Sequence, residues 1–436
     1  MSEATEGERQ EGRGPGWLAG VVADVTPLRI SAPYRRLWLG TSVSVIGQQM
    51  TVVAVAIQVY AITQSSFHVG LIGAFALVPL VVFGLYGGAI ADAVERRRLI
   101  LITQVGLMLL SVVLFVQATA GTDSVWLLYV IIAFQSGFFA VNNPARNAII
   151  PRLVGLDQLP AANALSQVTM NLGLTVGPLL GGVLIGATGG VRVAYGVDVV
   201  TYLVAVYAAW RLPPVPPLVA EGESPASARG RAGLASVLEG LRFLRTRTNL
   251  LMSFLVDIVA MVFGMPRALF PAVAGEFYGG GAGVVGLLSA APAVGALLGA
   301  LFSGRLPGVR WQGRAVLVAI TVWGFAIAVF GLTSTLWVGL LLLAVAGCAD
   351  MVSAVFRSTI LQVATPDALR GRLQGVFVVV VAGGPRLGDV ESGAVAALFG
   401  ERVSIVSGGL LCVAGIGLLT ALFPRFAHYD GRHPEP

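Results

Sequence analysis

Three acidic residues, Asp257, Asp350 and Glu391, stand inside long apolar stretches of this sequence. An ionisable side chain within a membrane span is costly to bury, which makes it a functional hypothesis. A carboxyl group held there can bind and release a proton, so we interpret all three as proton-coupling candidates, with Asp257 first and Asp350 second. For Asp257 and Asp350 the alternative is a static ion pair with Arg357 or another arginine.

Two more charges lie next to Glu391, in the segment VAGGPRLGDVESGAVA (residues 381–396). Arg386 and Asp389 are spaced i, i+3 on one helix face, so we expect a buried pair in which each charge offsets the burial cost of the other. This pair is either a static brace or a contact that opens during function. Glu391 points about 200° away from Asp389 and needs a different partner.

Uncharged polar side chains and one further arginine complete the set of candidate residues. Gln48, Gln49 and Gln135 fall near the middle of predicted spans, and Phe138 adds apolar surface close by. Amides at this depth hydrogen-bond either a ligand or a neighbouring helix, and both alternatives remain open. Arg267 is expected near the outer surface, as a snorkelling side chain or as part of an outer gate. These five are the substrate-cavity candidates.

The composition indicates the elements that hold these residues. Hydrophobic residues make up 56% of the chain and charged residues only 11%, against about a quarter in soluble proteins. Apolar runs long enough to cross a bilayer recur along the sequence, and the short alternating strands of a β-barrel are missing. We predict an all-α polytopic membrane protein with twelve transmembrane helices, at about 37–62, 67–91, 99–120, 124–145, 161–187, 193–212, 249–273, 283–304, 315–333, 336–357, 373–399 and 404–424.

Several kinds of chemistry are excluded by residue type. All 28 basic residues are arginines, so neither the lysine of an ATP-binding P-loop nor a Schiff-base lysine is available. Cys348 and Cys412 have no partner spacing, and the three histidines form no metal-ligand cluster. We therefore expect no cofactor and no metal. The net charge of +6 does not indicate a nucleic-acid partner, because the arginines follow the membrane topology.

The arginine distribution predicts the orientation. All but four of the 28 arginines fall on one side of the predicted topology. Of those four, Arg192 and Arg402 lie in loops on the other side, while Arg267 and Arg386 lie inside spans. The positive-inside rule then places both termini in the cytoplasm.

The longest polar stretch divides the chain into two sets of six spans. We expect a cytoplasmic tail (1–32), an N-terminal half (33–212), a linker with an interfacial amphipathic helix (213–248), a C-terminal half (249–424) and a second tail (425–436). The halves repeat at a shift of 210 or 211 residues, which aligns Arg146 with Arg357. Duplicated six-helix halves are typical of secondary transporters.

Two motifs carry a resemblance to a known family. The segment GGAIADAVERRRLI resembles the loop signature of the major facilitator superfamily, and the resemblance implies a cytoplasmic latch between the halves, formed by Gly88, Asp92, Arg96 and Arg97. The segment GLTVGPLLGG resembles the antiporter motif of drug:proton exporters in that superfamily, with Gly173, Gly177, Pro178, Gly181 and Gly182 at its motif positions. Ordinary glycine packing is the alternative for this second motif, since glycines spaced i, i+4, i+8 let another helix approach closely.

The paired segments NNPARNAIIPRLVGLDQLPAANAL and FRSTILQVATPDALRGRLQGV resemble the branch that contains the enterobactin exporter and macrolide-type efflux proteins. The resemblance covers nearly all of residues 33–424. It implies a monomeric exporter in the cell inner or plasma membrane, which moves a small amphiphilic molecule, drug-like or siderophore-like, by proton antiport with alternating access. A dedicated siderophore or natural-product exporter is one alternative. A membrane-embedded enzyme or a lipid scramblase is an alternative of a different class.

Overall fold

The computed structural model describes residues 24–214, 242–301, 309–364 and 367–432, without the side chains of 85–93 and 364–379. Over these residues the chain is helical, apart from short connections and one isolated β-bridge between Trp311 and Asp430. The helices are α1 (Thr26–Ile30), α2 (Ala32–Thr63), α3 (Ser66–Ala93), α4 (Arg96–Ala120), α5 (Val125–Val154), α6 (Leu159–Thr188), α7 (Arg192–Trp210), α10 (Thr248–Phe263), η1 (Arg267–Leu269), α11 (Phe270–Glu276), α12 (Ala282–Leu301), α13 (Gln312–Leu332), α14 (Leu336–Ala364), α15 (Asp367–Phe399), α16 (Glu401–Leu422) and α17 (Pro424–Ala427).

The membrane fold agrees with the prediction from hydropathy. Within the described residues, eleven candidate spans are long and apolar enough to cross a membrane, and α15, which contains the charged segment 381–396, adds a helix of 33 residues. Each predicted span coincides with one of these segments. The twelve-helix class is therefore confirmed, and the segment 381–396 is helical throughout. The predicted amphipathic helix of the linker lies largely outside the described residues.

One predicted span, 249–273, is not a single helix. It consists of α10, the 3-10 turn η1 and α11. Pro266 cannot donate a backbone hydrogen bond and restricts the residue before it, so the helix ends at Gly264. The Trp323 indole N–H donates to the Gly264 carbonyl oxygen at 2.9 Å, which satisfies an acceptor that the break leaves free.

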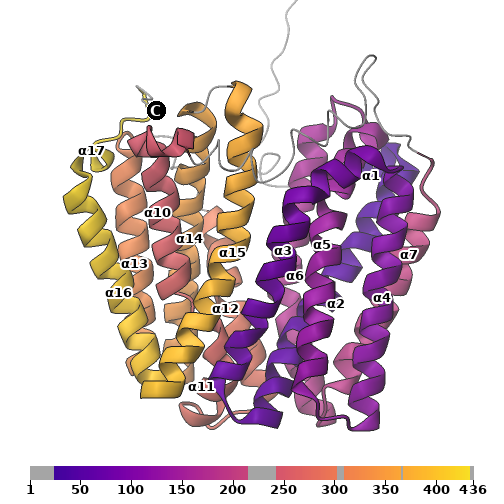
Figure 1. Cartoon of the computed structure of the whole chain (residues 1–436), viewed down its shortest axis with the longest axis horizontal. Helices are drawn as coiled ribbons and strands as arrows, with labels where there is room; N and C mark the ends of the chain where they lie inside the picture. The colour runs from indigo at the N-terminus through magenta and orange to yellow at the C-terminus, as the bar shows by residue number, and fades with distance from the viewer. Residues whose placement is uncertain (1–23, 215–241, 302–308, 365–366, 433–436) are drawn as a thin grey trace, which may run out of the picture.

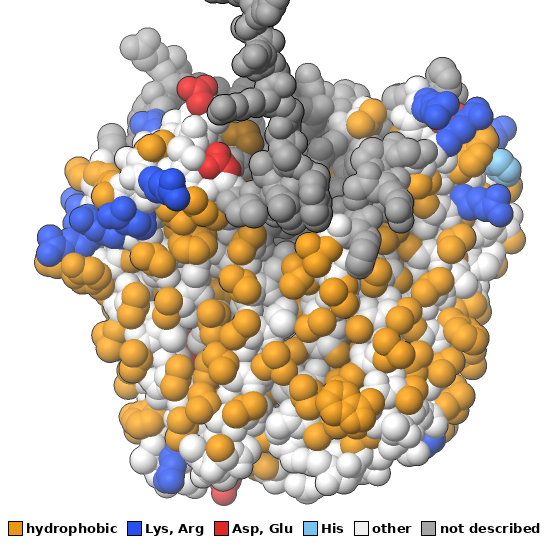
Figure 2. Space-filling model, turned by 180° about the vertical axis from the view of Figure 1, so that it is seen from behind, with side chains coloured by type: hydrophobic (Ala, Val, Ile, Leu, Met, Phe, Trp, Pro, Cys, Tyr) orange, Lys and Arg blue, Asp and Glu red, His pale blue; other side chains and the backbone are white. Residues whose placement is uncertain are grey.

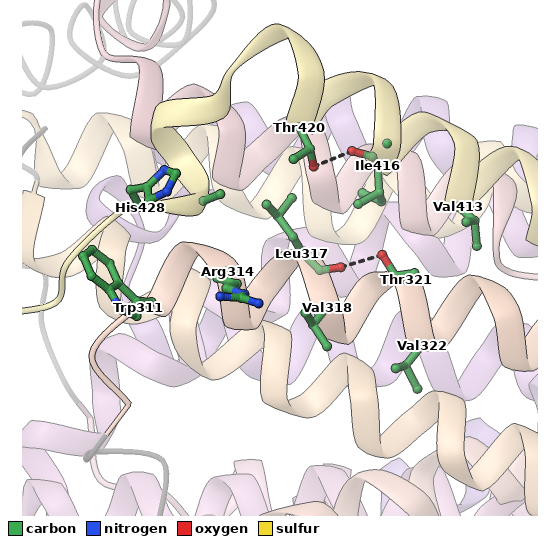
Figure 3. A pocket seen from close by; sticks show the side chains of 12 residues that line it. Trp311, Arg314, Leu317, Val318, Thr321, Val322, Val413, Ile416, Thr420 and His428 are labelled. Carbon is green, nitrogen blue, oxygen red and sulfur yellow. Dashed lines mark hydrogen bonds between the residues drawn. The ribbon is translucent and has the colours of Figure 1, made fainter.

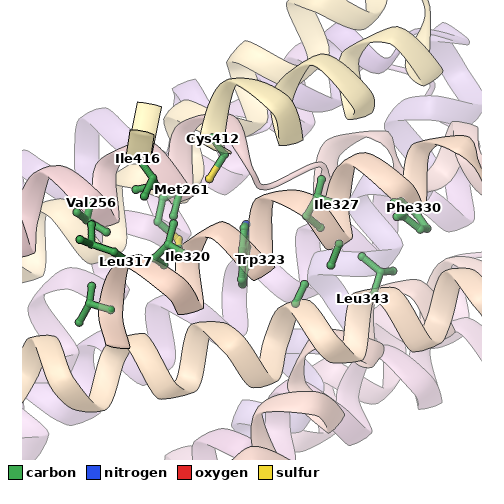
Figure 4. Packing of buried hydrophobic residues seen from close by; sticks show 14 of the residues in the cluster. Val256, Met261, Leu317, Ile320, Trp323, Ile327, Phe330, Leu343, Cys412 and Ile416 are labelled. Atoms are coloured by element: carbon green, nitrogen blue, oxygen red, sulfur yellow. The ribbon is translucent and has the colours of Figure 1, made fainter. Parts of the chain in front are cut away.

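The helices form two groups (Figure 1): α2–α7 lie on one side and α10–α16 on the other. In the second group, Trp323, Phe330 and Cys412 belong to one buried cluster, which Figure 4 shows from close by. The face seen in Figure 2 carries a broad hydrophobic band, with most of its arginines gathered toward one end. This is the arrangement expected of a protein surrounded by lipid.

The two groups meet through glycines near the end remote from the C-terminus, where α3 and α15 converge (Figure 1). There Gly70 of α3 and Gly393 of α15 lie against each other, and so do Gly182 of α6 and Gly286 of α12. A Cβ atom built on Gly182 would lie 2.9 Å from the Cα of Gly286. The repeat relates α3 to α12 and α6 to α15, so the two crossings are equivalent. Small residues allow this close approach of backbones.

We expect Gly286→Val to hold α6 and α12 apart, because a Cβ at this position would stand 2.6 Å from the Pro178 carbonyl oxygen. Overpacking of this kind costs about 1–3 kcal/mol. The measurement is the cross-linking rate between cysteines introduced at Ser66 and Glu401, whose side chains hydrogen-bond between the two groups at 2.8 Å. We expect cross-linking to slow at least ~5-fold.

The matched control is Gly283→Val, in the same helix, since a Cβ built there meets nothing within 4 Å. Both variants are made with Cys348 and Cys412 replaced by alanine. Equal cross-linking rates in the two variants would contradict the role given to the Gly182–Gly286 crossing.

Candidate functional site

A buried cluster of charges joins α10 to α14. Arg357 contacts Asp257 through Nη1 and lies 3.7 Å from Asp350 through Nη2. Its Nε donates to the Ser353 hydroxyl at 3.1 Å. Asp257 and Arg357 are only 2% and 6% exposed. Asp350, Ser353 and Arg357 are spaced i, i+3, i+7, so one face of α14 carries all three and α10 brings the second acid to them.

Two carboxylates therefore share one guanidinium group, and they do not share it equally. Asp257 is enclosed and held directly by Arg357. The Asp350 side chain is 32% exposed, and its Oδ1 has no hydrogen-bond partner. Adding a proton to Asp350 would leave a neutral Arg357–Asp257 pair in place. Asp257 is thus the direct ion-pair partner of Arg357, while a proton role for either acid stays a prediction.

The N-terminal half has no such acid pair at the equivalent place. Arg146 of α5 donates to Asn143 Oδ1 at 3.0 Å, and the described residues include no acidic partner for it. The repeat places Ile46 and Phe139 where the other half has Asp257 and Asp350. The duplicated frame therefore carries an uncompensated arginine in one half and an arginine with two acids in the other.

The break in the seventh span determines the partner of Asp389. Arg267 begins the turn η1 beyond Pro266, and its Nη2 lies 3.4 Å from Asp389 Oδ2. Arg386 and Asp389 form no direct ion pair among the described residues, although the two charges lie close enough to interact electrostatically, so their pairing stays a prediction. The i, i+3 spacing permits that pair but does not require it. The Asp389 side chain instead faces α3, where Gly73 leaves room for it.

Glu391, two residues further along α15, is half-buried. Within the part of the chain that the structure describes, it has neither an ion-pair nor a hydrogen-bond partner. Its suggested proton role stays a prediction.

The GLTVGPLLGG segment packs α6 against two different helices. A side chain on Gly173, Gly177 or Gly181 would run into α2, at Val45, Gln49 and Met50. Gly182 instead faces α12 of the other half, as does the Pro178 carbonyl oxygen. The close approach predicted for these glycines is observed, while the link to antiport stays a prediction.

The second Gly-Pro-x-x-Gly segment, in α15, repeats the contact that α6 makes with α2 inside its own half. Gly384 and Gly388 of α15 lie against Met261 of α10, which corresponds to α2 in the repeat. In both halves a Gly-Pro-x-x-Gly segment thus packs a proline-containing helix against the first helix of that half.

The residues of the expected cytoplasmic latch are only partly described. Gly88 and Asp92 lie in the portion of α3 whose side chains are not described. Arg96 is buried at the start of α4. Arg97 donates to the Trp210 carbonyl oxygen at 2.8 Å, which ties α4 to α7 within the N-terminal half. A latch between the halves stays a prediction.

The amide candidates remain open, and Phe138 takes a packing position. Gln48, Gln49 and Gln135 are half-buried and have no hydrogen-bond partner among the described residues. The Phe138 ring lies against Gly106 of α4, inside the N-terminal half. Packing between α4 and α5 accounts for this ring without a ligand.

Sequence reasoning missed a buried polar group in the N-terminal half. Asp198 of α7 is 0% exposed and accepts a hydrogen bond from the Ser111 hydroxyl at 2.6 Å. Near it, the Tyr195 hydroxyl donates to Gln58 Oε1 at 2.7 Å, and Gln58 and Gln117 bond each other. The signal was present as polar residues in three apolar segments, but their common location needs the fold. Within the described residues, no His, Cys, Asp and Glu group could hold a metal ion.

The family described as "Transmembrane secretion effector", of the major facilitator superfamily, matches residues 22–431. The enterobactin exporter EntS of Citrobacter koseri is 31% identical over 417 residues, covering 94% of this chain and 95% of that protein. EntS of Escherichia coli is 30% identical, covering 94% and 96%.

Solved structures share the fold at low sequence identity. A bacterial homologue of the human lysosomal transporter Spinster, in an inward-facing and unoccupied conformation, gives a TM-score of 0.68 at 17% identity, covering 93% of this chain and 98% of that one. The nucleoside transporter NupG gives 0.65 at 14% identity, covering 90% and 98%. The chain belongs to the transmembrane secretion effector family of the major facilitator superfamily and is a membrane transporter, not an enzyme.

Proposed function

We propose that this protein exports a small, siderophore-like amphiphilic molecule across the cell inner or plasma membrane in exchange for protons. The single observation that carries the proton step is the Arg357 guanidinium shared by Asp257 and Asp350. The siderophore-like class rests on relatives about 30% identical over 94% of the chain that are named enterobactin exporters. The concentration of arginines at one end supports cytoplasmic termini.

In the proposed cycle Asp350 carries the proton, and Asp257 keeps Arg357 neutralised. The exposed part of the Asp350 carboxylate accepts a hydrogen bond from a hydroxyl or amide group of the substrate, since this side chain is 32% exposed. Protonation from the outer side removes a lone pair and the charge of that acceptor, so the substrate is released. After the halves rock to open the other side, the proton passes to cytoplasmic water. This order reverses the sequence-based preference for Asp257.

Arg146 is the matching candidate on the N-terminal half. It is a cation without an acidic partner among the described residues, at the position equivalent to Arg357. A siderophore presents oxygen atoms, because oxygen donors chelate iron. We propose that these oxygens accept hydrogen bonds from Arg146 while a donor group of the same molecule binds Asp350.

Transport is tested with purified protein in liposomes carrying a pH gradient. We expect iron-free enterobactin to accumulate against its gradient and an uncoupler to abolish the accumulation. A lipophilic cation such as ethidium, added in excess, should compete in a broad drug exporter and not in a dedicated one. Uncoupler-insensitive equilibration of substrate, or lipid scrambling without substrate accumulation, would contradict proton antiport.

We expect Asp350→Asn to abolish gradient-driven transport but to retain substrate exchange, because the amide still binds and cannot carry a proton. We expect Asp257→Asn to lower the amount of folded protein, because it removes the direct partner of a buried Arg357, at a cost of about 3–5 kcal/mol. Asp123→Asn is the control, since Asp123 is exposed in the loop before α5. Normal proton-coupled transport by Asp350→Asn would remove Asp350 from the mechanism.

We expect Arg146→Gln to raise the KM for substrate roughly tenfold, because a hydrogen bond to a charged group contributes about 1.5–3 kcal/mol, with a smaller effect on the maximal rate. The matched control is Arg152→Gln, an exposed arginine six residues further along α5. Initial-rate kinetics in the same liposomes give both constants. If the two variants share the wild-type KM, Arg146 does not contact the substrate.

A further inference from the structure

A groove runs along the outer face of the C-terminal half, between α13 and α16 (Figure 3). Its volume is about 760 Å³, and its walls are built largely of aliphatic side chains such as Leu317, Val318, Val322, Val413 and Ile416. Val318 and Val322 are 55% and 41% exposed, so the groove opens to the surroundings of the protein. It is separate from the charged cluster at Arg357.

The polar side chains inside the groove are already satisfied. The Thr321 hydroxyl donates to the Leu317 carbonyl oxygen at 2.8 Å, and Thr420 donates to Ile416 in the same way at 2.7 Å (Figure 3). The length of the groove therefore offers only apolar contact to an occupant.

One end of the groove is polar and carries an arginine. Arg314, Trp311 and His428 line it (Figure 3). Arg314 is exposed, and the described residues provide no acidic or hydrogen-bonding partner for it. Arg310, by contrast, is neutralised by Asp430 at 2.8 Å and lies over the Trp311 ring. Arg314 is the arginine among the residues that line the groove.

The segment after α16 fixes the backbone conformation at this polar end of the groove. Gly431 N–H donates to the Arg310 carbonyl oxygen at 3.0 Å, next to the bridge between Trp311 and Asp430. Phe426 is fully buried beneath it, and the rings of Trp311 and His428 meet edge to face. The site is thus built before any ligand arrives, which lowers the ordering cost of binding.

We propose that this groove binds an anionic phospholipid, with an acyl chain along α13 and α16 and the phosphate on Arg314. The charge and the apolar length are complementary to these two parts of the lipid. Tryptophan at the end of a hydrophobic band lies at headgroup depth, and basic pockets between transmembrane helices suit anionic headgroups. Arginine-rich patches lie at the corresponding end of the molecule (Figure 2).

The test measures retention of phosphatidylglycerol and phosphatidylcholine by the full-length protein in native mass spectrometry. We expect wild type to prefer phosphatidylglycerol and Arg314→Gln to bind it roughly tenfold more weakly, which corresponds to about 1.4 kcal/mol. Arg36→Gln removes an exposed arginine at the start of α2 and should bind like wild type. Equal phosphatidylglycerol binding by both variants would overturn the proposal.

A second variant tests the apolar part of the groove. Val318→Trp should fill it and reduce retention of phosphatidylglycerol, whereas Val200→Trp, at an equally exposed position on α7, should not. Glycerol phosphate, which has the same charged group without acyl chains, should not compete. Full competition by glycerol phosphate, or unchanged retention in Val318→Trp with a wild-type elution profile, would show that the groove holds no acyl chain.

Discussion

The structure depends on keeping one arginine, Arg357, inside an apolar helix bundle. Its direct contact with Asp257 joins α14 to α10, and the second acid, Asp350, leaves the group one negative charge in excess. In hydrocarbon an uncompensated charge cannot be solvated by water, so each of these side chains constrains where the other two lie. The cluster is therefore a structural connection between α10 and α14, and in the proposed cycle it is also where the proton binds.

The two halves share a packing scheme but differ in their polar interiors. In both, a Gly-Pro-x-x-Gly segment seats a helix on the first helix of the half. The C-terminal half then buries an arginine between acids, whereas the N-terminal half satisfies Asp198 with the Ser111 hydroxyl and leaves Arg146 to Asn143. The two halves therefore share their helix packing, but they present different polar side chains: an arginine with two acids in one half and an arginine beside an amide in the other. A substrate with both donor and acceptor groups fits such an arrangement.

Helices could be predicted from the sequence because a membrane admits no other open backbone arrangement, so hydropathy alone located the twelve spans. The glycines of α6 were also readable, since their spacing puts them on one face. Which side chains pair between different helices could not be predicted from the sequence. The spacing of Arg386 and Asp389 allowed a pair, yet Asp389 meets Arg267, which reaches it from a turn that Pro266 creates. The partner of Asp198 could not be predicted either, because Ser111 lies on another helix.

The crossings between the halves have a mechanical consequence. At Gly182–Gly286 and Gly70–Gly393 the nearest contacts are between backbone atoms of the two helices. Interlocked side chains must change rotamer before two helices can part, and each change adds a barrier. Bare backbones can slide or separate as rigid surfaces, losing only weak dispersion contacts over a small area. The two glycine crossings can therefore pack closely and still separate without local rearrangement. The rate at which they open is then set by the motion of the two halves as whole bodies.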